Sequence, residues 1–428
     1  MKLAKRTNAP TSNYIWLLLV LFIASTPLRL FANDENGIRF GPIEEGTASG
    51  GTVDREFIRN WESNPPLGYP TLSPANIAAT QKAIKKYQDI VANGGWETVP
   101  EVKLAYGQTD SAVPILKSRL MVSGEYPDKG NNSSYFDGDL ENALKKFQAT
   151  NGLTPTGVLD ERTVLALNVP AQSRLRQLRS SLGRMQNYSS NTQKQRYVVV
   201  NIPAAQVEAV EGNKVISRHT AVVGKPERPS PIMTTTIQEM NFNPVWHLPP
   251  TVVTKDLIPR GREMQKAGKN VLLKFGIDAF DGAGKKLDPK TIAWDTKEPF
   301  GLSYKQKPGK ENPLGFLKIN FNSDQSVYMH DTPSETIFGR NFRAASSGCI
   351  RVNNIEKLAV WLLSSNKGWN ESRIDTVKEK GERLDVKLKK PVTLYFVYIT
   401  AWATPDGATQ FRRDIYDRDG AGPDVSAY

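Results

Sequence analysis

The chain has 428 residues, of which 39% are hydrophobic and 23% charged, a size and composition that fit two or three folded domains with real cores. Its formal net charge of +12 favours anionic partners such as lipid headgroups, nucleic acid or an anionic cell wall. Zinc-finger spacing and RNP-type aromatic motifs are both missing from the sequence, which argues against nucleic acid.

The N-terminal segment 1–32 predicts an export signal. Two lysines and an arginine precede an apolar run over 14–24, and Leu30-Phe31-Ala32 is a candidate cleavage end. The run is well short of the roughly 20 residues that a bilayer-spanning helix needs. Because Leu30 occupies a position where a small residue is favoured, a retained signal anchor that tethers the chain to a membrane is the alternative to cleavage. A buried N-terminal helix is the third interpretation.

A linker and a helical scaffold are predicted over 33–104. The segment 33–66 is rich in Gly, Glu and Asn without a sustained period, which favours loop. Ser73-Pro74 then predicts a helix start. Apolar residues continue one helical face until Gly94-Gly95 ends it; they are Ile77, Ile84, Tyr87 and Val91.

Three short amphipathic stripes follow over 105–170 and predict a three-helix unit with its own core. The stripes comprise Val113, Leu116 and Leu120; Leu140, Ala143, Leu144 and Phe147 behind Asp137; and Val164 and Leu167 after Asp160-Glu161. The stretch "YFDGDLENALKKFQATNGLTPTGVLDERTVLALN" resembles the peptidoglycan-binding domain appended to cell-wall enzymes. The resemblance implies binding to the peptidoglycan sacculus. A helical spacer without a ligand is the alternative.

After a linking helix over 171–195, the period changes to that of β-strands, which predicts a mainly β domain over 196–400. Its strands are expected at "YVVVNIP", "QVEAV", "VISRHTAVVG", "LKINF", "SVYMH" and "PVTLYFVYITAW". Between them, about 251–312 is Lys-rich and irregular in pattern, which predicts an inserted lid or cap. Residues 401–428 form a C-terminal extension. The expected fold class is therefore multidomain α+β.

Cys349 is the only cysteine of the chain, and His330 lies 19 residues before it in "VYMHDTPSETIFGRNFRAASSGCIRVNN". A lone thiol in an exported protein is either a small buried hydrophobe or a reactive group. Ser, Gly and Arg surround Cys349 instead of an apolar run, which favours reactivity. A neighbouring imidazole would activate the thiol, so we expect Cys349 to be a nucleophile and His330 its base.

The residues around Cys349 have predicted supporting roles. Gly348 permits turn geometry, and the backbone N–H groups of Gly348 and Cys349 would form an oxyanion hole. Arg351 would point to the same side as Cys349 along an extended segment, where it would raise the positive potential or bind a substrate carboxylate. Asn353 or Asn354 would cap an amphipathic helix that begins at Ile355.

The segment "HDTP…SSGCIRVNN" resembles the signature of L,D-transpeptidases with a YkuD-type catalytic domain. The matching positions are His330, Ser346, Gly348, Cys349, Ile350, Arg351 and Asn354. Ser347 departs from many relatives, in which a second His precedes the Gly. "FNPVWHLPPTVVTKDLIP" and the Ser-Ser-Gly-Cys form resemble the large subgroup that carries both a cap and a peptidoglycan-binding domain.

The resemblance implies an enzyme of the periplasm or cell envelope that acts on peptidoglycan stem peptides. Cys349 would attack the diaminopimelate carbonyl of a tetrapeptide stem, release D-alanine and pass the acyl group to a second stem as a 3→3 crosslink. Carbapenem-type β-lactams would acylate Cys349 covalently. No metal or organic cofactor is expected, because no cluster has zinc-ligand spacing.

Several alternatives stay open at the level of sequence. If water hydrolysed the acyl-enzyme, the protein would be a carboxypeptidase. With other acyl donors or acceptors it would be a crosslink hydrolase or a lipoprotein-attaching enzyme. The chain could also be a non-catalytic wall-binding protein. We interpret His219 and His247 as structural, and Trp246 and Trp294 as either core or cleft. The insertion's lysines are expected first as a solvated face; they are Lys285, Lys286, Lys290, Lys297, Lys305, Lys307 and Lys310.

Overall fold

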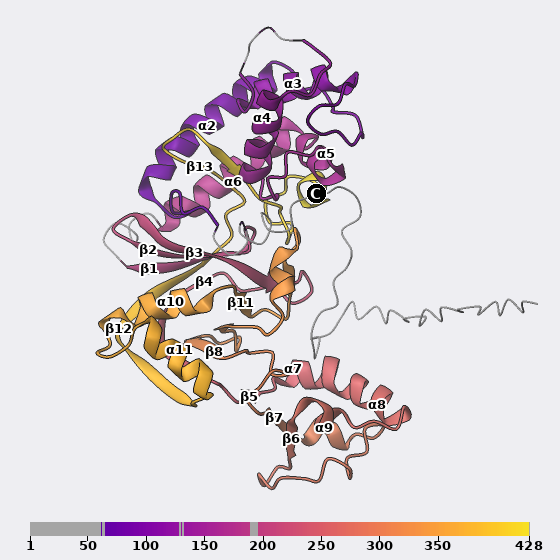
Figure 1. Ribbon diagram of the computed structural model, residues 1–428, viewed down its shortest axis with the longest axis vertical. Coiled ribbons are helices and arrows are strands. Elements are labelled where there is room, and N and C mark those ends of the chain that lie inside the picture. Colours follow the sequence, from indigo (N-terminus) through magenta and orange to yellow (C-terminus); the bar gives the residue numbers. More distant parts are fainter. Residues whose placement is uncertain (1–60, 62–64, 128–129, 131, 189–195, 428) are drawn as a thin grey trace, which may run out of the picture. The chain divides into compact units, whose positions relative to one another are not determined.

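Helices make up the N-terminal part of the computed structural model, which describes residue 61 and residues 65–127, 130, 132–188 and 196–427. The predicted export signal over 1–32 lies outside these ranges. The helices are α2 (Pro74–Ala92), α3 (Ala112–Ser123), α4 (Gly138–Thr150), α5 (Glu161–Leu167) and α6 (Ala171–Tyr188) (Figure 1). Among the described helices, none is both long and apolar enough to cross a membrane.

Helix α2 starts at Pro74 as predicted, with Ser73 in extended conformation before it, although the Ser73 side chain makes no capping hydrogen bond. The helix packs on α6 and on a hairpin near the C-terminus, formed by β13 (Ala401–Ala403) and β14 (Thr409–Phe411). Tyr87 of α2 contacts the ring of Phe411 edge-on at 5.4 Å. The start of the C-terminal extension is therefore part of the helical scaffold.

Helices α3, α4 and α5 enclose one apolar core, as the three stripes predicted. Asp137 caps α4 by accepting a hydrogen bond of 2.9 Å from the Leu140 N–H. Gln148 fixes the following loop, because its amide donates to the Val158 carbonyl at 2.8 Å and its oxygen accepts from the Gly157 N–H at 2.9 Å. The core is completed from the far end of the sequence by Ala421 and Val425, the latter in α12 (Asp424–Ala427).

A closed, barrel-like sheet forms the β domain. Its strands run in the order β2-β3-β11-β9-β8-β4-β12-β1 and return to β2, and β10 pairs with the end of β3. The bounds are β1 (Tyr197–Asn201), β2 (Gln206–Glu211), β3 (Lys214–Gly224), β4 (Met233–Phe242), β8 (Leu317–Phe321), β9 (Met329–His330), β10 (Ala344–Ser346), β11 (Ile350–Val352) and β12 (Leu384–Val397). β9 is shorter than the run "SVYMH" predicted.

The sheet is covered on more than one side, which explains the unbroken apolar run of β1. Val198 and Val200 face the main core of the barrel, whereas Tyr197 and Val199 pack toward α2 and α6. Strands buried on both faces lose the alternation of a half-exposed strand. The main core is closed by α10 (Ile355–Leu362), η4 (Leu363–Ser365) and α11 (Glu371–Lys380).

The inserted segment, whose sequence pattern is irregular, is a subdomain of short helices and strands. It contains β5 (Trp246–His247), α7 (Pro250–Val252), the π-helical turn η1 (Val253–Leu257), α8 (Ile258–Lys266), α9 (Val271–Phe275), β6 (Ile277–Phe280), η2 (Glu298–Gly301) and β7 (Ser303–Gln306) (Figure 1). β5, β7 and β6 form a separate sheet over a separate core. Pro259 sits in the first turn of α8, and Gly261 lets that helix approach Trp294, whose ring lies 2.4 Å from where a Cβ would be.

Candidate active site

Cys349 lies immediately before β11, whose pairing of Ile350 with Met329 and of Arg351 with His330 brings Cys349 to the level of Tyr328, two residues from His330. Arg351 of β11 pairs with His330 of β9, which pairs with Lys318 of β8. Alternate residues of a strand share a face, so Cys349, Arg351, Tyr328 and His330 lie on one face of the sheet. The intervening residues Ile350, Met329 and Ile319 belong to the barrel core. The candidate site is therefore on the outer face of the barrel wall.

The thiol of Cys349 is free and partly exposed, and its polar contact is with Tyr328. The side chain and the backbone of Tyr328 hydrogen-bond the sulfur. The Tyr328 hydroxyl also accepts a hydrogen bond of 2.9 Å from the indole N–H of Trp246, in β5 of the insertion. Trp246 and Tyr328 thus connect the insertion to Cys349.

His330 is almost fully buried, with 5% of its surface exposed. Its Nδ1 lies 2.5 Å from the Asp331 carbonyl, which can only accept, so we assign the proton of the neutral ring to Nδ1. In this tautomer Nε2 is the basic nitrogen. A second backbone carbonyl, that of Pro313, also acts on the ring and favours its protonated form. Burial, together with the nearby charge of Arg351, lowers the pKa of His330 to about 3. In the described structure, His330 makes no hydrogen bond to Cys349.

Cys349 and His330, the candidate nucleophile and base, are both neutral near pH 7. Burial raises the pKa of the Cys349 thiol, although hydrogen bonds from Tyr328 and the charges of Lys318 and Arg351 lower it in part. Since the pKa of His330 is also far below neutrality, the imidazole is unprotonated. This arrangement suits proton transfer during attack and not a preformed thiolate–imidazolium pair.

The loop before Cys349 is tied internally. Gly348 has φ of +112°, a conformation that favours glycine, as the sequence predicted. Its N–H donates to the Ser346 hydroxyl at 3.1 Å, and that hydroxyl donates to the Cys349 carbonyl at 2.6 Å. The Gly348 N–H is therefore engaged, unlike in the predicted oxyanion hole. The Cys349 N–H, in contrast, donates to no acceptor within the described ranges.

Ser347 is held from another part of the chain. Its hydroxyl accepts a hydrogen bond of 2.8 Å from Arg228, which also forms an ion pair of 3.2 Å with Asp256. Asp256 belongs to η1 of the insertion, and its side chain is buried. The guanidinium of Arg228 thus links the loop before Cys349 to the insertion.

The remaining residues considered in the sequence analysis are Arg351, Asn354, His219 and His247, and each has its own environment. Arg351 is 9% exposed and beside Cys349. Asn354 precedes α10 with φ of +48°, but its side chain makes no capping hydrogen bond, contrary to the prediction. His219 is buried, with Nδ1 at 2.9 Å from the Asn353 carbonyl and Nε2 at 2.9 Å from the Ser217 hydroxyl. His247 is exposed.

Four residues near the thiol were missed from the sequence: Arg228, Asp256, Lys318 and Tyr328. Tyr328 stands two residues before His330, so alternation along the strand could have placed it on the same face. The other three come from elements distant in sequence, and only the fold brings them to Cys349. Trp246, which the sequence left open as core or cleft, contacts Tyr328. Trp294, in contrast, is core of the insertion, stacked on Tyr304 at 6.1 Å.

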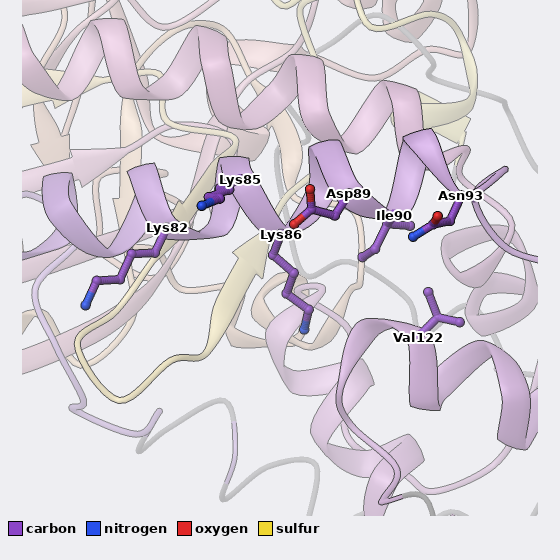
Figure 2. A pocket seen from close by; sticks show the side chains of 8 residues that line it. Lys82, Lys85, Lys86, Asp89, Ile90, Asn93 and Val122 are labelled. Atoms are coloured by element: carbon purple, nitrogen blue, oxygen red, sulfur yellow. The ribbon is translucent and has the colours of Figure 1, made fainter.

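A hollow of about 600 Å³ lies elsewhere, between α2 and α3 (Figure 2). It is lined by Lys82, Lys85, Lys86, Asp89, Ile90, Asn93, Gly95 and Val122. The ammonium of Lys86 donates to the Ser123 carbonyl at 2.7 Å across it. None of these residues belongs to the Cys349 site.

Residues 195–392 match the family model YkuD, described as "L,D-transpeptidase catalytic domain", and residues 109–167 match the model "Putative peptidoglycan binding domain". The barrel with Cys349 and His330 falls in the first match, and the three-helix unit in the second. The chain therefore contains an L,D-transpeptidase catalytic domain of the YkuD family together with a peptidoglycan-binding domain. Both resemblances found in the sequence are confirmed.

One curated relative, named "Putative L,D-transpeptidase" from Haemophilus influenzae, is 33% identical over 227 residues, which cover 52% of this chain and 44% of the relative. The chain thus spans about half the length of that relative. An L,D-transpeptidase from Mycobacterium smegmatis is 15% identical over 47% of this chain and 58% of its own, with a TM-score of 0.21. An L,D-transpeptidase from Stackebrandtia nassauensis is 15% identical; the match covers 72% of this chain and 99% of the other, with a TM-score of 0.27.

Proposed function

We propose that this chain is an exported cysteine acyltransferase that forms 3→3 crosslinks between peptidoglycan stem peptides. The observation that carries the proposal is the position of the free, partly exposed Cys349 beside the row of His330 within the L,D-transpeptidase domain. A thiol flanked by a neutral imidazole and by two cations is equipped for acyl transfer.

In the first half-reaction, the Cys349 sulfur attacks the carbonyl carbon of diaminopimelate in a tetrapeptide stem. The thiol proton moves to Nε2 of His330, and the negative charge on the carbonyl oxygen is met by the Cys349 N–H. The tetrahedral intermediate then expels the nitrogen of D-alanine, which takes the proton from His330. An acyl-thioester remains on Cys349.

In the second half-reaction, the side-chain amine of another stem attacks the thioester carbon. Its proton passes to His330 and then to the departing sulfur, which regenerates the thiol. The same sequence with water in place of the amine would give a carboxypeptidase, and with other donors or acceptors a crosslink hydrolase or a lipoprotein-attaching enzyme. Each step uses side chains of this chain alone.

We assign the three-helix unit to sacculus binding and the segment 1–32 to export to the periplasm or cell envelope, with a membrane tether if that segment is retained. A peptidoglycan-binding domain raises the local concentration of stems at Cys349 without altering the chemistry. Carbapenem-type β-lactams would acylate Cys349, because their strained amide carbonyl takes the place of the scissile carbonyl.

The test compares the wild type with Cys349→Ala on purified sacculi and on soluble tetrapeptide muropeptides, followed by mass spectrometry. We expect dimers with release of D-alanine from the wild type and neither product from Cys349→Ala, with sacculus binding retained by both. Tripeptides without dimers would assign a carboxypeptidase. Sacculus binding with an unreactive Cys349 would assign a non-catalytic wall-binding protein.

A further inference from the structure

A cleft of about 220 Å³ lies between the peptidoglycan-binding unit and the outer face of the barrel. Its floor includes Gln206 of β2 and Thr220 of β3, which pair with each other in the sheet. Its walls include the end of α4 with the loop after it (149–154), the segment 338–343 and the hairpin of β13 and β14. Segments far apart in the sequence thus meet over one patch of the sheet.

The cleft is separate from the site of Cys349, although both lie on the outer face of the barrel. Val222 of β3 pairs with Arg351, and its side chain packs against η3 (Glu335–Gly339). Thr220 precedes Val222 by two residues and shares its face of the strand. Because β11 runs antiparallel to β3, Cys349 lies beyond Val222 in the opposite direction. Helix η3 therefore covers the sheet between the cleft and the thiol.

Positive charge predominates in the lining of the cleft. Among the described residues that line it, four are arginines and one, Asp406, is acidic. One of the arginines forms an ion pair of 2.9 Å with Glu208 below the floor. Even with Glu208 included, cations outnumber carboxylates by four to two. Such a cleft favours an anionic ligand. The arginines are Arg218, Arg340, Arg343 and Arg412.

Backbone carbonyls hold two of these guanidinium groups in place. Arg412 donates to the Thr150 carbonyl at 2.8 Å, and Arg343 donates to the Ala204 carbonyl at 3.3 Å. A planar guanidinium that is fixed in position binds a carboxylate with little further loss of freedom. Aromatic and amide side chains beside them suit a peptide backbone; they are Tyr69, Gln206, Asn341, Trp402 and Gln410.

We propose that this cleft binds an acidic stem peptide of peptidoglycan other than the two stems that react at Cys349. The inference rests on the proposed function, which makes stem peptides the ligands of this chain. The segments that match the peptidoglycan-binding model and the catalytic-domain model both contribute walls. Free carboxylates of a stem match the arginines in charge. The cleft is smaller than the roughly 300–1,000 Å³ of a pocket that encloses a drug-sized ligand, so it holds part of a stem.

A second bound stem would keep a peptidoglycan strand beside Cys349 while another stem of the same strand reacts. Once one stem is held, the others are present at a high effective concentration. The ligand would also touch the segment 338–343, which belongs to the loop that joins His330 to Cys349. The cleft thus adds to the retention of the sacculus and takes no part in the acyl transfer itself.

The experiment titrates a soluble stem tripeptide that ends in diaminopimelate into full-length protein whose Cys349 has been blocked with a carbapenem, followed by calorimetry. The blocked wild type should bind this tripeptide about tenfold more tightly than its fully amidated form. Arg340→Glu, at an exposed position of the wall, should weaken binding of the acidic form by about tenfold. Gln410→Glu, which keeps the shape of the side chain, should weaken it as well.

Arg179→Gln is the matched control, because Arg179 is exposed on α6 and does not line the cleft. It should bind the tripeptide as the wild type does. Absence of binding to the blocked wild type, or equal binding by the wild type and both glutamate variants, would refute the site. If the carbapenem fails to acylate Cys349, the proposed function is in question, and the same titrations in the Cys349→Ala background decide about the cleft alone.

Discussion

The guanidinium of Arg228 donates a hydrogen bond of 2.8 Å to the hydroxyl of Ser347, two residues before the proposed nucleophile. The same guanidinium is paired at 3.2 Å with Asp256, in the π-helical turn η1. Turns of π-helix often occur at functional sites. The loop that carries Cys349 is thus tied to the insertion through the contact of Ser347 with Arg228.

Arg228→Ala should slow acylation of Cys349 by roughly ten- to hundred-fold, because the loop that carries the thiol loses its tie to the insertion and a small misplacement of reacting groups is expensive. The readout is the rate of carbapenem adduct formation followed by mass spectrometry. Ser347→Ala in the Arg228→Ala background should cost little more, since the two changes remove the same hydrogen bond.

Lys255→Ala is the control for this prediction, because Lys255 is exposed on the same turn as Asp256. It should acylate at the wild-type rate. Additive effects of Arg228→Ala and Ser347→Ala would show that the hydrogen bond between the two side chains does not position the loop.

Tyr328→Phe should raise the pKa of the Cys349 thiol, because the hydroxyl that hydrogen-bonds the sulfur is removed. Alkylation by iodoacetamide at pH 8 should slow by up to about tenfold, and the midpoint of its pH profile should move upward. Tyr106→Phe, an exposed tyrosine of the helical region, is the control. An unchanged midpoint would rule out a hydrogen bond from Tyr328 to the sulfur.

Acid should destabilise the fold through its buried histidines. Burial lowers the pKa of His330 to about 3 and that of His219 to about 4, from 6.5 for a free histidine. The unfolded chain thus binds protons first as the pH falls below 6.5, which costs about 1.4 kcal/mol per pH unit for each histidine. Asp331 acts in the opposite direction, because burial raises its pKa to about 6 and the folded state gains a proton there.

Urea unfolding at pH 7.5 and at pH 5 measures this effect, and the free energy of unfolding should be lower at pH 5. Asp331→Asn should steepen the loss, since it removes a group that opposes it. Equal stability of the wild type at the two pH values would contradict the neutral state of His330.

Local sequence patterns were sufficient to predict the helices and strands in which they occur. The stripe on α4 behind Asp137 and the apolar runs of β1 and β12 were placed correctly, because helix caps and strand periods are written in neighbouring residues. Cys349 stood out as the candidate nucleophile because it is the lone cysteine of the chain and lies in a Ser-Gly-Cys-Ile-Arg motif.

The insertion and the surroundings of the thiol required the fold. In the insertion, α7, η1 and α8 follow one another without a break over 250–266, but a π-helical turn and Pro259 interrupt the regular helical period there, and the other elements are only two to five residues long. Pro259 and Gly261 suggested irregular backbone, yet both lie in α8, where Gly261 admits the Trp294 ring. Likewise, no sequence pattern joins Arg228 to Ser347 or Lys318 to His330, since those contacts depend on strand order.

The ring of His330 makes no hydrogen bond to Cys349 in the described structure, so a substitution of His330 tests its role as the base directly. If His330 is the base, His330→Ala should slow acylation by about 10²–10⁴-fold, the usual contribution of a positioned general base. His247→Ala should acylate at the wild-type rate, since His247 is exposed in the insertion. His219 is better replaced by Gln, because both of its ring nitrogens hold buried partners. If a carbapenem acylated the His330→Ala variant at the wild-type rate, Cys349 would remain the proposed nucleophile. Tyr328 would then be the next candidate for its base.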